Sequence, residues 1–212
     1  MMEVLGAAAL AAAPVEGLRA VVARPGAADD FRAWLVSNHR PETTLACTEG
    51  WAGLASLCFR IWEPAPGDPV RRSRRWVTAA DLTAWATDAV LLRAALGVAG
   101  REHVAQATTH QIEGISGEYL KIVDGDGWSA SALLAPDALA ARLGGPPIAV
   151  ALPSDTVMLA WKPGNDQVDL IMAVGVHEVF AAAEAPVTEV VHRWDGTTWT
   201  AWAMTLPATP SP

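Results

Sequence analysis

Lysine is almost absent from this chain of 212 residues: only Lys121 and Lys162 occur, and the formal net charge at pH 7 is −8. A nucleic-acid partner is therefore not expected, because phosphate binding needs a positive field. Long apolar runs are also absent. No run reaches the ~20 residues that a membrane-spanning helix needs, so no membrane partner is expected either.

Cysteine is equally scarce, with only Cys47 and Cys58. These are too few for a disulfide scaffold. A single bridge is compatible with the sequence, but reduced thiols in a cytoplasm are the favoured interpretation. The apolar segment 4–13 is similar to a signal peptide, yet Glu3 stands where a basic residue would be expected. We therefore expect an ordinary first helix and a cytoplasmic protein.

The motifs that identify common enzymes are missing. No Cys/His cluster has zinc spacing, no glycine-rich loop follows a strand in the dinucleotide or Walker manner, and no serine has a Gly-x-Ser-x-Gly setting. Asp124 and Asp126 lack the later glutamate of an EF-hand loop, so they predict a tight turn. We expect neither a metal nor a cofactor, and no motif identifies the function.

The length fits one compact domain with a sizeable core. Within it we expect a helix-rich N-terminal lobe over 1–106, an α+β lobe over 107–205 and a disordered tail over 206–212. The expected fold class is α+β, with a mixed or mostly antiparallel sheet packed with two long helices.

The N-terminal lobe contains signals for both kinds of element. Apolar spacing predicts helices over 3–13 and 15–23. Strict alternation predicts a strand over 55–62, and the prolines that follow predict a loop over 63–69.

The longest predicted helix covers 78–96. Thr78 can cap its start, Asp81 completes a box-like N-terminus, and Gly97 stands where a left-handed C-terminal cap is expected. Its apolar stripe should pack on the sheet and consists of Leu82, Trp85, Ala89, Leu92 and Leu96.

The stretch 117–161 predicts most of the sheet. After a strand over 107–115 we expect a strand (117–123), a turn (124–127), a strand (128–134), a short helix (136–143) and two strands within 148–161. A second long helix should run from Asn165 or Asp166 to about Ala183. Its predicted buried stripe consists of Val168, Ile171, Met172, Gly175 and Val179.

The last pattern, over 187–204, predicts a hairpin around Asp195-Gly196. A two-residue turn would place His192 opposite Trp199. In this hairpin Trp199 and Trp202 would lie on opposite faces.

The residues of 127–134, 136–139 and 148–159 resemble a bacterial family, the YtpQ-like proteins of unknown function. The resemblance covers roughly 111–183. It implies a strand, a short helix, a strand that ends at a Pro-x-Asp corner, and then a strand and a helix. It implies an α+β fold and no particular activity.

Asp155 is the most site-like residue, because it follows Pro153 at the corner between two apolar strands. Such a carboxylate can bind a cation or act as a general base if folding brings a histidine close, His110 or His177. The alternative, which we favour, is that Asp155 fixes the turn through its own backbone. A hydrolase-like enzyme is therefore one functional hypothesis.

Four arginines, Arg71, Arg72, Arg74 and Arg75, precede Trp76. One hypothesis is that they bind an anion or a small molecule. The favoured alternative is an edge strand whose charges prevent aggregation, or a solvated loop.

The sequence contains ten tryptophans. A helix over 28–36 places Trp34 on a predicted buried face, and most of the others should fill the core. An exposed ring, at Trp199 or Trp202, would mark an interface, because tryptophan is enriched at binding hot spots. The leading hypothesis is a module that binds another protein, of the adaptor or immunity type; a homodimer is compatible with this.

Overall fold

The computed structural model describes residues 18–23, 27–38, 43–48, 56–65, 68–123 and 129–202. The predicted helix over 3–13, the turn over 124–127 and the tail over 206–212 lie outside these residues. In chain order the elements are β1 (Leu18–Ala23), α2 (Ala27–Ser37), β2 (Cys47–Thr48), β3 (Ser56–Ala65), β4 (Asp68–Trp76), α3 (Ala79–Ala84), α4 (Ala89–Gln106), β5 (Thr108–Gln111), β6 (Glu118–Val123), the 3-10 helix η2 (Ser129–Leu134), α5 (Pro136–Arg142), β7 (Ile148–Ala151), β8 (Val157–Trp161), α6 (Asp166–Ala182), β9 (Val191–Trp194) and β10 (Trp199–Trp202).

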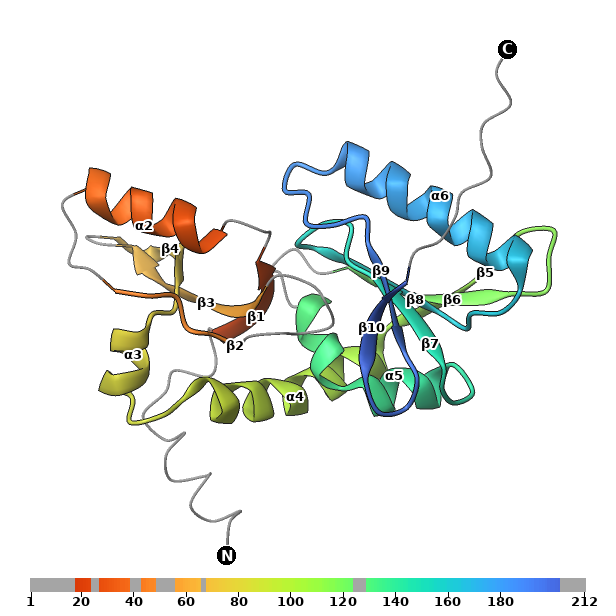
Figure 1. The fold of residues 1–212 in the computed structure, drawn as a ribbon, viewed down its shortest axis with the longest axis horizontal. Helices are drawn as coiled ribbons and strands as arrows, with labels where there is room; N and C mark the ends of the chain where they lie inside the picture. Colours follow the sequence, from red (N-terminus) through yellow and green to blue (C-terminus); the bar gives the residue numbers. More distant parts are fainter. Residues whose placement is uncertain are drawn as a thin grey trace, which may run out of the picture.

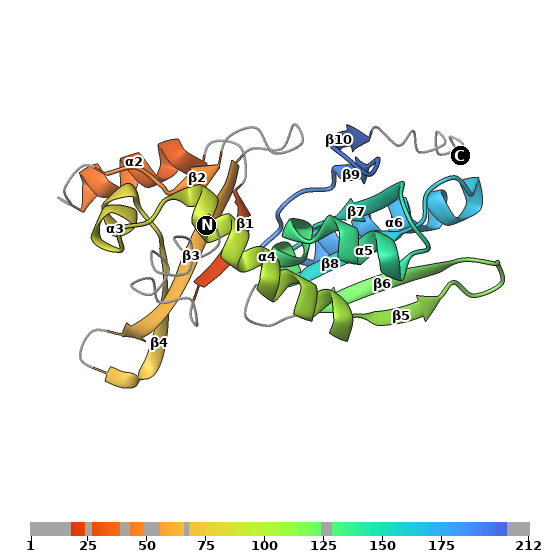
Figure 2. The same ribbon diagram turned by 90° about the horizontal axis from the view of Figure 1, so that it is seen from below.

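The second half of the chain forms a six-stranded sheet in the order β10-β9-β7-β8-β6-β5 (Figure 1). Every neighbouring pair is antiparallel. The helix α6 lies over one face, whereas α4, α5 and η2 lie over the other (Figures 1 and 2). This arrangement confirms the predicted α+β class, with a mostly antiparallel sheet and two long helices.

The central strand β7 contributes to the apolar core on both faces of this sheet. Ala149 and Ala151 belong to the cluster under α6, and Ile148 and Val150 belong to the cluster on the side of α4 and α5. All four residues are buried. Burial on both faces explains why this strand is an uninterrupted apolar run rather than an alternating one.

The first half of the chain contains a second, four-stranded antiparallel sheet. In it β3 pairs with β1 along one edge and with β2 and β4 along the other. The predicted helix over 15–23 is wrong for 18–23, because β1 occupies these residues; 15–17 lie outside the described residues. Leu18 and Ala20 are both fully buried, and a spacing of two is the period of a strand. The N-terminal lobe therefore combines its helices with a sheet.

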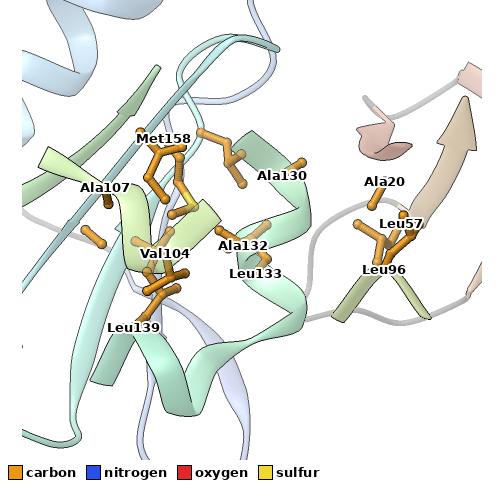
Figure 3. Packing of buried hydrophobic residues seen from close by; sticks show 14 of the residues in the cluster. Ala20, Leu57, Leu96, Val104, Ala107, Ala130, Ala132, Leu133, Leu139 and Met158 are labelled. Atoms are coloured by element: carbon orange, nitrogen blue, oxygen red, sulfur yellow. The ribbon is translucent and has the colours of Figure 1, made fainter. Parts of the chain in front are cut away.

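One apolar cluster joins the two sheets through α4 (Figure 3). Near the middle of this helix, Leu96 lies beside Ala20 of β1 and Leu57 of β3. Near its end, Val104 packs close to Leu139 of α5. The 3-10 helix η2 also takes part, because the hydroxyl of Ser131 accepts a hydrogen bond from the backbone N–H of Ala20 at 3.4 Å. The helices α4 and η2 together thus connect the cores of the two sheets.

The predicted helix over 78–96 is two helices. The capping box of Thr78 and Asp81 is confirmed at the start of α3. The chain then turns at Ala86, whose φ is 50°, and the Asp88 side chain caps α4 by accepting from the backbone of Leu91. The predicted end at Gly97 is wrong, since α4 continues to Gln106.

Gly97 and Gly100 lie inside α4 because η2 packs directly against the helix backbone. A Cβ on Gly100 would lie 2.3 Å from the carbonyl oxygen of Ser131, and one on Gly97 would lie 3.2 Å from that of Leu134. The strand predicted over 128–134 is wrong, because η2 occupies this place. Its residues are buried almost throughout, and a short buried apolar run has no period that separates strand from helix.

The C-terminal hairpin has a register different from the predicted one. Trp194 lies opposite Trp199, and His192 lies opposite Ala201. The carboxylate of Asp195 accepts hydrogen bonds from the backbone N–H groups of Thr197 and Thr198, at 2.7 and 2.8 Å. These bonds stabilise a four-residue connection in place of the expected two-residue turn, so the predicted pairing of His192 with Trp199 is wrong.

Candidate functional site

Asp155 lies in the connection between β7 and β8, as the sequence predicts. It is half-buried, and its backbone N–H and carbonyl groups both form hydrogen bonds with other segments. Its N–H donates to the carbonyl oxygen of Ala185 at 3.3 Å, and its own carbonyl accepts from the buried hydroxyl of Ser129 at 3.0 Å. The backbone of this residue therefore links the corner to η2 and to the segment before β9.

The structure does not bring His110 to Asp155. His110 lies opposite Tyr119 on β6, and Tyr119 lies opposite Trp161 at the far end of β8. His110 is thus two strands away from β8 and level with its last residue, whereas Asp155 precedes its first residue. Two strand spacings across the sheet and four residues along β8 place the backbone of His110 about 16 Å from the start of β8. Catalytic partners must be within ~3 Å or one water apart, so this pair does not form a site.

The second candidate histidine, His177, lies on α6 and is exposed. Its Nδ1 is 2.5 Å from a carboxylate oxygen of Glu189. This contact connects α6 to the segment that leads into β9. The structure thus gives His177 a partner on the neighbouring segment rather than at the β7–β8 corner.

The four arginines lie on β4, which pairs with β3 and has no second strand neighbour among the described residues. The predicted loop over 63–69 is much shorter, because the two strands continue to Ala65 and from Asp68 as a hairpin. A register shift next to Pro64 accommodates the proline in the strand. Of Arg71, Arg72 and Arg74, only the backbone is described.

Arg75 has a structural partner. Its Nη1 donates to Asp81 Oδ2 at 2.8 Å and to the carbonyl oxygen of Trp76 at 3.2 Å. Burial is the largest single influence on the Asp81 carboxyl and raises its pKa. Hydrogen bonds from Arg75 and Thr78 together outweigh burial, so the pKa lies below its usual value. Arg75 therefore supports the start of α3.

The two candidate tryptophans of β10 are both half-buried. Trp199 packs against the core on the α4 side of the sheet and Trp202 against the core under α6, so they lie on opposite faces as predicted. Trp34, by contrast, is not on a buried face. It is 50% exposed and stacks on Phe31, since α2 turns the neighbouring Leu35 inward.

Cys47 and Cys58 form a disulfide. The expectation of reduced thiols is therefore wrong for this structure. The two residues lie directly opposite each other in the antiparallel pair of β2 and β3, a register that the sequence does not reveal. The bridge fastens the short strand β2 to the sheet.

His192 is the buried histidine of the described chain, with 1% of its surface exposed. Its neighbours across the sheet are Val150 on β7 and Ala201 on β10. Burial lowers its pKa to about 4, although a backbone hydrogen bond at Val190 acts in the opposite direction. The imidazole is therefore neutral at pH 7 and belongs to the core.

The outer face of α6 was not identified from the sequence. Leu170, Ile171 and Val174 are 39%, 44% and 44% exposed, and spacings of three and four place them on one side of the helix. We name these three residues the outer patch. The opposite side of the helix is buried through Val168, Met172, Ala173 and Val176.

The predicted inner stripe of α6 was thus only partly correct. Val168 and Met172 are buried, but Ile171 is not. Val168, Met172 and Val176 follow one another at four-residue steps and define the line of contact with the sheet. Ile171 lies ~100° away from Met172 around the helix. A helix with apolar residues on all sides is a signal that could have indicated the outer patch.

The chain around the outer patch is acidic. Asp166 precedes Leu170 by four residues and Glu178 follows Val174 by four, and both acids are exposed. They therefore border the patch at its two ends. Residues 163–190 contain no Lys and no Arg, and their acids are Asp166, Asp169, Glu178, Glu184 and Glu189.

Comparison of this chain with protein-family models, with curated proteins and with solved structures gives no match. Within the described part of the chain, no three or more His, Cys, Asp and Glu side chains are grouped so that they could hold a metal ion. None of the described helices is both long and apolar enough to cross a membrane.

Proposed function

We propose that this chain is a protein-binding module of the adaptor or immunity type, and that the outer patch of α6 contacts the partner. The observation that carries the proposal is the exposure of three large aliphatic side chains, Leu170, Ile171 and Val174, on one helix face. Single exposed apolar residues are ordinary, but a contiguous apolar surface bordered by charges is typical of an interaction site.

Gly175, next to the outer patch, supports the same proposal. A glycine inside a helix costs about 1 kcal/mol relative to alanine. Apart from its chain neighbours and the nearby backbone of α6, no atom of the described residues lies within 4 Å of the place where its Cβ would be, so packing among these residues does not require a glycine here. A partner that packs closely against the backbone of α6 would require one.

The two other hypotheses receive less support. An enzyme that uses Asp155 needs a histidine within reach, and the sheet separates His110 from it while His177 contacts Glu189. An anion site on the arginines of β4 would lose one of its members, because Arg75 is bonded to Asp81.

The compartment is part of the proposal. The composition favours the cytoplasm, whereas the disulfide of Cys47 and Cys58 is of the kind that persists in oxidising compartments. Thiol alkylation in intact cells of the source organism distinguishes a cytoplasmic location from an oxidising compartment. A cytoplasmic protein should be labelled at both cysteines, and protection of both would place it in an oxidising compartment.

Site-specific photo-crosslinking in cells of the source organism tests the binding function. A photoreactive residue at position 174 is compared with one at position 98, where α4 also exposes a valine, with 56% of its surface accessible. The proposal expects a discrete protein adduct from position 174 and none from position 98. No adduct from either position, or the same adducts from both, would contradict it.

A further inference from the structure

The charges around the outer patch restrict the chemistry of its partner. Asp166 and Glu178 border the patch, and Glu184 and Glu189 follow on the segment that leads to β9. The nearest basic side chains along the chain are Lys162, whose Nζ contacts the carbonyl oxygens of Gly145 and Pro146, and Arg193 on β9. The balance around the patch is acidic, so complementarity favours a basic partner.

The shape of the patch restricts the partner further. Its residues follow the helix axis, and the bordering acids Asp166 and Glu178 are about 18 Å apart along it, which is roughly three helical turns. The apolar strip between these acids, from Leu170 to Val174, extends about 6 Å along the axis, which is roughly one helical turn. Apolar anchors at i, i+3 and i+4 of an amphipathic helix match a strip of this length, and basic residues beyond them would reach the two acids. The open space at Gly175 allows the two helix backbones to approach closely.

We infer that the partner of the outer patch is an amphipathic helix whose apolar stripe is flanked by Lys or Arg, an inference that depends on the proposed protein-binding function. A second copy of this chain is a poorer occupant. If two α6 helices paired through their outer patches, the acids Asp166 and Glu178 of one copy would face the same acids of the other copy at both ends of the contact. Like charges that face each other oppose association.

The direct test uses designed peptides and the full chain. The cationic peptide has leucines at i, i+3 and i+4 and lysines elsewhere. One control has glutamates in place of the lysines, and a second has the composition of the cationic peptide in a scrambled order. Fluorescence anisotropy should show at least tenfold tighter binding of the cationic peptide than of either control, and the preference should weaken as salt is raised. Equal binding of all three would overturn the inference.

Matched variants locate the binding surface. Val174→Gln should lower the affinity for the cationic peptide at least tenfold, because Val174 lies between the two bordering acids, Asp166 and Glu178. Val98→Gln on α4 removes a valine that is more exposed than Val174, 56% against 44%, and should change the affinity less than twofold. Glu178→Gln should weaken binding severalfold and reduce the salt dependence. An equal loss for Val98→Gln and Val174→Gln would overturn the inference.

Two further results separate this inference from the proposed function. If position 174 captures a protein in cells and the cationic peptide does not compete with it, the partner class is wrong and the proposed function stands. If position 174 captures nothing, the proposed function itself fails. An adduct of position 174 with a second copy, or with residues 1–17 or 203–212 of the same chain, would also overturn the inferred partner.

Discussion

The two long helices α4 and α6 lie over opposite faces of the same sheet, yet their glycines have opposite surroundings. Within α4, a Cβ on Gly100 would collide with the backbone of Ser131 at 2.3 Å. Within α6, a Cβ on Gly175 would meet no atom of the other described segments within 4 Å. The same residue type therefore marks a filled contact in one helix and an open surface in the other.

The remaining contacts of the two helices agree with this difference. The end of α4 is fastened by Arg142 of α5, whose guanidinium donates to the carbonyl oxygens of Val104, Ala105 and Ala107 at 2.9 to 3.0 Å. Its exposed valines, Val90 and Val98, are two turns apart. In α6 the exposed aliphatic residues are adjacent. We conclude that α4 is a structural element on several sides, whereas α6 is structural on one side only.

The largest expected difference is in the free energy of unfolding when an aspartate is introduced into α4 or into α6. Leu92→Asp in α4 should lower the free energy of unfolding by about 4 kcal/mol, because it places a charge at a position with 0% exposure. Ile171→Asp in α6 should change it by less than about 0.5 kcal/mol. Urea denaturation of both variants measures the difference, and similar losses would remove the distinction between the two helices.

The next effect is a pH dependence on the α4 side of the sheet. Burial lowers the pKa of His192 to about 4, below its ordinary value of 6.5. The unfolded chain therefore binds a proton that the folded chain does not, and stability should fall as pH is lowered from 6.5 to 4, by up to about 3 kcal/mol.

Denaturation curves measured across this pH range check the prediction for His192. The variant His192→Leu cannot take up a proton and should lose this part of the pH dependence. An unchanged dependence in that variant would show that other groups cause it.

A smaller effect is expected from filling the glycines of α4. Gly100→Ala should destabilise the protein by about 2 kcal/mol, since the added carbon meets backbone that cannot move aside easily. Gly97→Ala should cost less, because the corresponding distance is 3.2 Å. Thermal or urea unfolding measures both variants, and a neutral Gly100→Ala would mean that η2 is not packed as described.

The smallest expected effect has the opposite sign. Gly175→Ala in α6 should stabilise the isolated protein by about 0.5 to 1 kcal/mol, because it improves helix propensity without a clash. The same variant should bind the cationic peptide less tightly if the helices approach closely at this point. Destabilisation by Gly175→Ala would show that the face is not open.

Much of the sheet could be predicted from the sequence because its signals are local. Apolar runs and alternation predicted β3, β6, β7 and β8, and Asn165 marked the start of α6. What could not be predicted depends on distant contacts. The local pattern predicts a helix end at Gly97, yet this glycine is explained by its close contact with Leu134 of η2, which is 37 residues away in the sequence. Only the assembled structure places these backbones together.

The candidate site was also beyond the sequence, for a physical reason. Apolar residues surround α6 on all sides, so their spacing alone does not decide which side faces the sheet. Val168, Met172 and Val176 are selected by contact with β7, β8 and β9, and this leaves Ile171 outside. Asp155, by contrast, was placed correctly at the corner between two strands, because Pro153 and the flanking apolar runs are local signals.

The most direct test measures stability and partner binding on the same variant, Ile171→Asp. If the outer face of α6 is an open interface, the free energy of unfolding should stay within about 0.5 kcal/mol of the parent, while the protein adduct formed from position 174 disappears. A loss of several kcal/mol, comparable to that of Leu92→Asp, would show that Ile171 is part of the core and would contradict the account.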